Sequence, residues 1–267
     1  MSMKIDYASI EETVRNAGQM LRNAHLTTDR IYHKEGIANF VTLFDVEIQQ
    51  YLIRELAKIV QGASFFGEEE TDGNERNCLS DGYTFFVDPI DGTTNFMFGY
   101  HHSCVSVGLS YNRRMIAGFV YNPYVDEMYK AVRGEGSYLN LRRLQMENKP
   151  LSKGIVSFGC ARYNEADTDL LFDVVKELYL QSLSVRNGGS AALDLCRVAS
   201  GSNAAYVELM LQPYDYAAAS VIIEEAGGCI TQKDGSDITL DLPCSIVAGT
   251  PASAETVRYV IEQKRTG

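Results

Sequence analysis

The sequence predicts an α+β/α/β protein folded as a layered sandwich of alternating helices and sheets, with an N-terminal antiparallel sheet and two helices before a C-terminal α/β part. Short apolar runs separated by turn residues fill residues 64–132, as is typical of an antiparallel sheet. After the polar stretch 147–150, strand and helix signals alternate, which favours an α/β layer. A chain of 267 residues allows one large domain or two small ones, and we expect the parts to be 1–150 and 151–267.

Two amphipathic helices and five strands are expected in the N-terminal part. Apolar residues recur at helical spacing over 5–25, and a second helix is expected over 44–60, where an S/T-x-x-D start signal ends at Asp45. The expected strands are 64–66, 83–87, 104–111, 115–121 and 127–132. Polar linkers at 112–114 and 122–124 predict hairpin turns.

Three strands and four helices are expected in the C-terminal part. The expected strands are 155–158, 205–209 and 246–248, and the expected helices are 165–180, 190–199, 215–226 and 254–263. Gly227 and Gly228 supply the glycine signal that ends the third helix.

Charge and cysteine content narrow the classes of function. The formal net charge of −11 repels phosphate backbones, so no nucleic-acid partner is expected. The six cysteines form no C-x-x-C pair, which indicates reduced, mostly buried thiols in a cytoplasmic protein. No apolar run approaches the ~18 residues of a membrane span, so no membrane association is expected.

Acidic residues stand where predicted strands end or predicted helices begin, which is where folds display reactive groups. They are Glu68, Glu69 and Glu70 after strand 64–66, Asp88 and Asp91 after strand 83–87, and Asp215 before an apolar helix. Hard divalent ions such as Mg²⁺ take oxygen ligands of this kind. Taken alone, Asp215 is more often a helix N-cap and the glutamates a solvated loop.

The run from Asp88 to Asn95 (DPIDGTTN) is the most informative segment. The two aspartates and the Ile90 carbonyl can converge in a turn on a Mg²⁺ ion. The amides of Gly92 and Thr93, at the start of a short helix, can hold a phosphate. A turn whose aspartates cap backbone groups is the plainer alternative, which the complete run disfavours.

Signatures of other catalytic machinery are absent from the sequence. It contains no G-x-S-x-G elbow and no G-x-x-x-x-G-K-[ST] loop, and no histidine has a partner at zinc spacing. A water molecule activated by metal is therefore the expected nucleophile.

These segments resemble the inositol monophosphatase family over nearly the whole chain. The markers are 67–69 (GEE), 88–96 (DPIDGTTNF), 214–219 (YDYAAA) and 224–228 (EEAGG), with 41–45 (VTLFD) and Lys34 upstream. One departure is Tyr214, because the family usually has Trp at that position and this chain contains no Trp.

The resemblance implies Mg²⁺-dependent hydrolysis of a small phosphate monoester, most directly an inositol monophosphate, with two or three ions in the site. It implies that Glu68, Asp88 and the Ile90 carbonyl hold the first ion, that Asp88, Asp91 and Asp215 hold the second, and that Glu68 helps to hold a weaker third. Asp45 and Thr93 would orient the attacking water, which Glu68 could deprotonate. Family members are often inhibited by lithium, and many are homodimers.

The resemblance also implies contacts with a phosphorylated polyol or sugar. The phosphate would lie against Gly92 and Thr93, and the polyol against Glu208 and the segment matching Gly189, Ser190 and Ala191. A carboxylate can accept hydrogen bonds from two hydroxyls, which favours a polyol. Two alternatives stay open: Glu208 as a surface charge at a strand end, and 188–190 as no more than a helix start.

Other substrates fit the same machinery. Rival activities are fructose-1,6-bisphosphatase, histidinol-phosphate phosphatase and 3′-phosphonucleotide phosphatase. The last usually carries Lys-Glu after Asp-Gly-Thr, where this chain has 94–96 (TNF). A bisphosphate would want further basic residues, for which Arg162 and Arg186 are candidates. A different class is a non-catalytic protein that binds metal or sugar phosphate.

Overall fold

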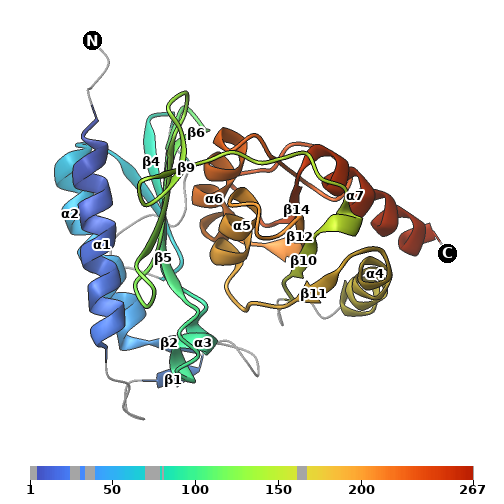
Figure 1. Ribbon diagram of the computed structural model, residues 1–267. Helices are drawn as coiled ribbons and strands as arrows, with labels where there is room; N and C mark the ends of the chain where they lie inside the picture. Colours follow the sequence, from blue (N-terminus) through green and yellow to red (C-terminus); the bar gives the residue numbers. More distant parts are fainter. Residues whose placement is uncertain are drawn as a thin grey trace.

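Five alternating layers of helices and sheets make up the structure (Figure 1). The computed structural model describes residues 5–24, 31–33, 40–69, 79, 81–160 and 167–266. In layer order, the helices are α1 (Tyr7–Asn23) and α2 (Leu43–Ile59) on one outer face, α5 (Ala191–Ala199) and α6 (Pro213–Glu225) between the sheets, and α4 (Thr168–Gln181) and α7 (Pro251–Thr266) on the other outer face. The predicted layered α+β/α/β sandwich is confirmed.

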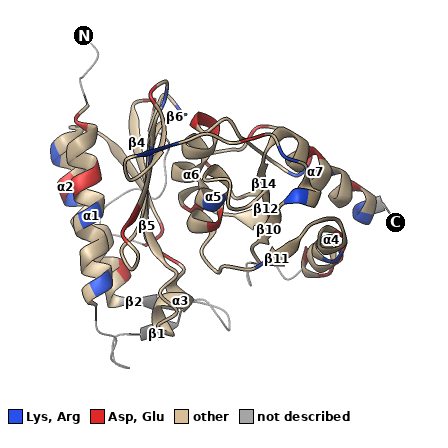
Figure 2. Ribbon diagram, viewed as in Figure 1, with Lys and Arg blue, Asp and Glu red and all other residues tan. Residues whose placement is uncertain are grey.

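Apolar side chains fill the space between each pair of layers. One buried cluster joins α1 and α2 to the seven-stranded sheet, a second joins that sheet to α5 and α6, and a third joins the five-stranded sheet to α4 and α7. Acidic and basic residues lie together on the outer helices α1, α2 and α7 (Figure 2). Among the described residues, no helix combines the length and apolarity needed to cross a membrane.

The larger sheet has seven strands in the order β3-β4-β5-β6-β7-β8-β9. They are β3 (Ser64–Gly67), β4 (Tyr83–Asp91), β5 (Cys104–Tyr111), β6 (Arg114–Asn122), β7 (Glu127–Val132), β8 (Gly136–Leu139) and β9 (Arg142–Leu144). Only the β3–β4 pair is parallel. A separate short pair joins β1 (Ile31–His33) to β2 (Phe40–Thr42). The sequence did not indicate β1, β2, β8 or β9.

Strand β4 differs from its expected form. The prediction ended the strand at Val87 and placed a turn at Asp88, but β4 continues to Asp91. Asp88 pairs with Ser106 and Asp91 with Cys104, so three residues on β4 span the same distance as two on β5. Such a bulge tolerates Pro89, which has no N–H to donate to a ladder. Both aspartates are therefore held by the sheet rather than by a free turn.

The smaller sheet has five strands in the order β11-β10-β12-β14-β13. They are β10 (Ile155–Phe158), β11 (Ser184–Arg186), β12 (Ala205–Leu211), β13 (Cys229–Thr231) and β14 (Cys244–Gly249). β10 runs parallel to β11 and β12, while β14 is antiparallel to β12 and β13. A one-turn 3₁₀ helix (Leu151–Lys153) links the two sheets. The sequence predicted β10, β12 and β14 but not the three-residue strands β11 and β13.

Helix α6 begins with a capping box, which corrects the position expected for Asp215. Gln212 is the N-cap, Pro213 is the first helical residue and Asp215 stands at the third position, where its Oδ2 accepts the Gln212 N–H at 2.9 Å. The helix is apolar and buried nearly all round because a sheet or helix covers each side.

Two glycines allow α6 to approach the larger sheet closely. Gly108 on β5 pairs with Gly118 on β6 directly below the helix. A Cβ on Gly118 would lie 2.1 Å from the Ala218 carbonyl oxygen, and one on Gly108 would lie 3.0 Å from the Ala218 nitrogen. Neither position can carry a side chain unless α6 moves away from the sheet.

We expect Gly118→Ala to reduce the free energy of unfolding by about 1–3 kcal/mol, because the methyl group overpacks a helix–sheet contact made by backbone atoms. Urea unfolding measures the loss. Gly134→Ala is the control, since a Cβ there meets nothing within 4 Å and its positive φ (+84°) adds only backbone strain, which Gly118 does not have. Equal destabilisation by the two variants would contradict the packing argument.

Candidate active site

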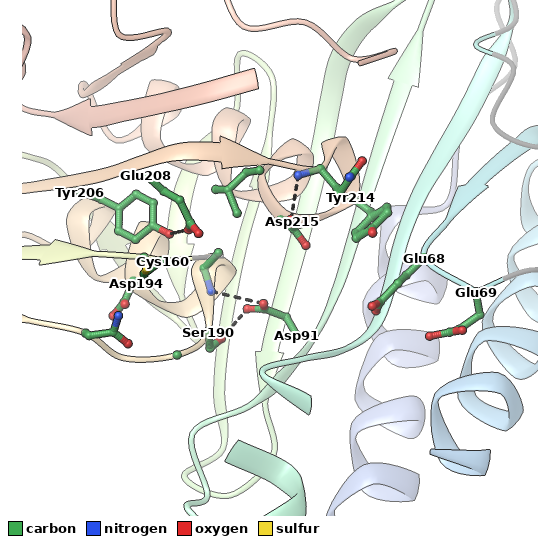
Figure 3. A pocket seen from close by; sticks show the side chains of 16 residues that line it. Glu68, Glu69, Asp91, Cys160, Ser190, Asp194, Tyr206, Glu208, Tyr214 and Asp215 are labelled. Atoms are coloured by element: carbon green, nitrogen blue, oxygen red, sulfur yellow. Dashed lines mark hydrogen bonds between the residues drawn. The ribbon is translucent and has the colours of Figure 1, made fainter. Parts of the chain in front are cut away.

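A cavity of about 610 Å³ opens between the two sheets. Its walls come from the end of β3, the end of β4, the start of α5, strand β12 and the start of α6. Figure 3 shows Glu68, Asp91 and Asp215 pointing into one space, with Glu208 further along on β12. The structure therefore gathers residues that are up to 147 positions apart in the sequence, from Glu68 to Asp215.

Two groups of carboxylates meet at this cavity. Asp88, Asp91 and Asp215 each offer an oxygen atom, and these atoms lie within 4.8 Å of one another. Asp45, Glu68 and Glu69 form a second group by the same measure. The sequence placed five of these six in the site but assigned no role to Glu69. Glu70, which follows them, lies outside the described residues.

In the first group Asp88 and Asp91 are buried and Asp215 is half-buried, and the group is electrostatically unfavourable without a cation. Burial raises the pKa of Asp88 well above its usual range, and the charges of Glu68, Asp91 and Asp215 raise it further. Burial also raises the pKa of Asp215, with the charges of Asp91 and Glu68 adding to the effect. Burial raises the pKa of Asp91 too, although hydrogen bonds from 190–192 oppose this.

These donors fit a hard divalent cation. All six are carboxylates, and within the described ranges neither group includes a histidine or a cysteine, the ligands that zinc sites favour. A bound cation would offset the mutual repulsion of the three carboxylates in the first group. Ile90, whose carbonyl was predicted as a further ligand, is fully buried between the two aspartates.

Asp91 also holds the start of α5. Its Oδ2 accepts a hydrogen bond from the Ser190 hydroxyl and from the Ala192 N–H at 2.8 Å, and its Oδ1 accepts the Ala191 N–H at 3.2 Å. The Cys104 thiol donates to the same carboxylate at 3.7 Å. Two backbone N–H groups at the N-terminus of α5 are thereby satisfied. The predicted polyol segment 189–191 is thus positioned by a predicted metal ligand.

Thr93 links the second carboxylate group to β4. Its hydroxyl lies 3.5 Å from Asp45 Oδ1 and 3.1 Å from the Ile90 carbonyl oxygen. It opens the five-residue helix α3 (Thr93–Met97) after Gly92, whose φ is +89°. A Cβ on Gly92 would lie 3.0 Å from the Gly189 carbonyl oxygen. Asp45, Gly92 and Thr93 adjoin the cavity residues without lining the cavity itself.

Asn95 and Asp194 both hydrogen-bond the backbone of Gly188, and the sequence assigned neither a role. Asn95 Nδ2 donates to the Gly188 carbonyl and to the His102 carbonyl, each at 2.8 Å. Asp194 Oδ2 accepts the Gly188 N–H at 3.1 Å. For Asp194 the sequence did offer a signal, because a charged residue inside the apolar run 191–196 (AALDLC) is typical of a buried, hydrogen-bonded group.

Gln49 is a further residue that the sequence reasoning missed. Its side chain is 1% exposed and makes two bonds to residue 69, donating to the carbonyl at 2.7 Å and accepting the N–H at 3.0 Å. It therefore fixes the backbone that carries Glu68. A polar residue on the apolar face of α2, one turn after Asp45, was the available signal.

Glu208 and Tyr214 resolve two open points. Glu208 is 5% exposed and lines the cavity, so the alternative of a surface charge is wrong. Tyr214, which stands where the family usually has Trp, also lines the cavity and packs against Phe66 at 6.4 Å between ring centroids. Arg186 is not among the described residues that line the cavity, and Lys34 and Arg162 lie outside the described residues.

Comparisons with known proteins place this geometry in context. A family model described as the inositol monophosphatase family matches residues 4–265. Inositol monophosphatase 1 of Bos taurus is 32% identical over 249 residues, covering 92% of this chain and 90% of its own length. A solved SuhB from Bartonella henselae superimposes with a TM-score of 0.87 at 27% identity, covering 96% of this chain and 98% of its own.

A further solved structure, SaIMPase-II, was determined with inositol monophosphate bound. It has a TM-score of 0.81 and 27% identity, and the match covers 97% of this chain and 95% of that one. The same protein was also solved with 2′-AMP bound.

Asp194 gives a prediction about stability and pH. Burial raises its pKa to about 7, and the Gly188 N–H and Arg197 only partly oppose this. Because the folded pKa exceeds the unfolded value of ~3.9, stability is greatest below pH 4 for this group and is lost as pH rises towards 7. Asp194→Asn, which keeps an acceptor for Gly188, should therefore be more stable than the wild type at pH 8.

Urea unfolding at pH 5 and pH 8 measures this difference. The gap between variant and wild type should be small at pH 5 and larger at pH 8. Asp173→Asn is the control, because Asp173 is an exposed aspartate on the outer helix α4. A gap of the same size at both pH values would contradict the argument.

Proposed function

We propose, from the premise that this chain belongs to the inositol monophosphatase family and is a phosphoric monoester hydrolase, that its substrate is an inositol monophosphate. One observation carries the proposal: a single cavity is lined by carboxylates of the two acidic groups and, further along, by Glu208. The two acidic groups can hold cations that attract a phosphate, and Glu208 can accept hydrogen bonds from a polyol. A relative solved with inositol monophosphate supports it.

The cation we assign is Mg²⁺, with two or three ions in the site. Glu68, Asp88 and the Ile90 carbonyl would hold one, and Asp88, Asp91 and Asp215 a second, with Glu68 at a weaker third. Carboxylate and carbonyl oxygens suit Mg²⁺, and the grouping of Asp88, Asp91 and Asp215 supports the assignment. When bound, such ions polarise the phosphate and lower the pKa of a coordinated water.

The chain's own groups would orient the reactants. Asp45 and Thr93, 3.5 Å apart, offer acceptors that can hold the hydrogens of an attacking water, and Glu68 can accept its proton. Gly92 is the N-cap of α3 and Thr93 is its first residue, so their N–H groups have no intrahelical partner and can donate to phosphate oxygens. Ser190 and Ala191, together with Gly189, would meet the polyol beside Glu208.

Two observations bear on the competing substrates. Arg186 is not among the described residues that line the cavity, so its positive charge is not available to a second phosphate in the site. This disfavours a bisphosphate substrate. The relative solved with 2′-AMP favours a nucleoside monophosphate as the second candidate.

We also propose, from the family resemblance, that the protein is a cytoplasmic homodimer and that lithium inhibits it. We propose in addition that the chain divides into two parts near residue 150.

Phosphate release from a panel of esters tests the function. We expect Mg²⁺-dependent release, fastest from inositol 1-phosphate, with 2′-AMP, fructose 1,6-bisphosphate, histidinol phosphate and adenosine 3′,5′-bisphosphate slower. Chelation by EDTA should abolish release. A faster reaction with any other ester would overturn the substrate, and no release from the whole panel would favour a binding protein.

Asp88→Asn should lower Mg²⁺-dependent activity at least about 100-fold, because a shared ligand loses its charge. It should also lose the Mg²⁺-induced rise in melting temperature that ligand binding gives the wild type. Without Mg²⁺ the variant should be at least as stable as the wild type, since one buried repulsive charge is gone.

Scanning calorimetry with and without Mg²⁺ provides the second readout, independent of activity. Asp241→Asn, at an exposed loop position, is the matched control and should keep the full Mg²⁺ response. If Asp88→Asn kept that response as well, the assignment of this residue to the cation would be wrong.

A further inference from the structure

Glu208 has a buried neighbour on its own strand. Tyr206 precedes it by two residues on β12, so both side chains leave the same face of the sheet. The Tyr206 hydroxyl donates a hydrogen bond to Glu208 Oε2 (Figure 3). Tyr206 has no exposed surface and Glu208 is 5% exposed, so the bond lies in a region shielded from solvent. Hydrogen bonds to an ionised acceptor are the stronger and more directional kind.

Tyr206 is held in a donor state. Burial raises the pKa of its phenol well above the usual range, and the Glu208 charge raises it further. The hydroxyl therefore keeps its proton while the carboxylate keeps an acceptor.

Gly159 makes room for this arrangement. Its N–H donates to the Val207 carbonyl at 3.1 Å, which extends the β10–β12 ladder by one residue and brings Gly159 beside Glu208. A Cβ on Gly159 would lie 1.9 Å from Glu208 Oε2 and 2.5 Å from the Tyr206 hydroxyl oxygen. Any side chain at this position would displace the carboxylate.

The backbone of β12 changes course immediately after Glu208. The strand pairs regularly with β14 up to Glu208 and Ile246, and then shifts register before Leu211 and Cys244. The extra residue in β12 is a bulge, a feature that re-aims side chains beside functional sites. Glu208 is thus the last regular residue of the strand before it turns into α6.

We infer that Tyr206 is a positioning residue that orients the Glu208 carboxylate for the polyol of the substrate, in a space that Gly159 leaves open. The inference rests on the proposed function, because it needs Glu208 to contact that polyol. Tyr206 acts through Glu208 and has no part in the chemistry at phosphorus. Its contribution should therefore concern the binding of one class of ester rather than the rate of hydrolysis.

The test compares two substrates, inositol 1-phosphate and p-nitrophenyl phosphate, of which only the first carries a polyol. Tyr206→Phe removes the hydroxyl and keeps the ring. We expect KM for inositol 1-phosphate to rise about tenfold, the order expected for one charge-assisted hydrogen bond, with kcat within about twofold. Both constants for p-nitrophenyl phosphate should stay within about twofold. Gly159→Ala is a second variant that should shift the same KM in the same direction.

Tyr129→Phe is the matched control. Tyr129 is another buried tyrosine on a strand, and its hydroxyl donates at 3.3 Å to a glutamate two residues away, Glu127, outside the cavity. The Tyr129–Glu127 pair makes the same kind of hydrogen bond, from a tyrosine hydroxyl to a glutamate carboxylate, but does not line the cavity. The control should leave KM and kcat unchanged for both esters.

The possible failures are distinguishable. If Glu208→Ala raises KM for inositol 1-phosphate but Tyr206→Phe does not, Glu208 acts without Tyr206 and the inference is wrong. Equal losses on both esters after Tyr206→Phe would indicate a general structural role and also overturn it. A wild-type enzyme with no preference for the polyol ester would instead refute the proposed substrate, and the inference would fall with it.

Discussion

The close contact between α6 and the seven-stranded sheet is the constraint on which the site depends. Asp88 and Asp91 stand at the end of β4, while Asp215 stands in the first turn of α6. Their separation is therefore set by how near the helix can lie to the sheet, and the glycine pair on β5 and β6 sets that distance. Because packed layers do not deform continuously, a small change beneath the helix would move one ligand relative to the other two.

Gathering three carboxylates, two of them buried and one half-buried, is unfavourable, and the fold offsets part of this cost with helix ends. Asp91 accepts backbone N–H groups at the start of α5, and Asp215 accepts one at the start of α6. The N-terminus of a helix carries partial positive charge, which favours a carboxylate there. The offset is incomplete, since the pKa values of both groups stay raised. A divalent cation would relieve the residual repulsion between these carboxylates. The same side chains would therefore lower the stability of the fold without a cation and bind the cation when it is present.

The sequence predicted the parts of the fold that carry a long periodic signal. The 17-residue helix α1 and the apolar helix α6 lie within about two residues of their expected bounds. Strands of three residues, such as β11 and β13, are too short to show a period of two. The strand through Asp88 was missed because Pro89 suggested an end, whereas pairing with β5 continues past it. Motifs identified the carboxylates, but the bond from Asn95 to Gly188 joins residues 93 positions apart, and no local pattern encodes it.

Selectivity and hydrolysis are assigned to different elements of this fold. The carboxylates that would hold cations come from β4, α6 and the end of β3, while the groups proposed to face the rest of the substrate come from β12 and the start of α5. A change on β12 can therefore alter which ester binds and leave the carboxylates in place. Differences of a few kcal/mol are sufficient for such discrimination. SaIMPase-II has been solved with inositol monophosphate and with 2′-AMP, so that protein binds two different phosphate esters. Under the proposed function, the orientation of Glu208 is the physical variable that would distinguish a polyol from other alcohols.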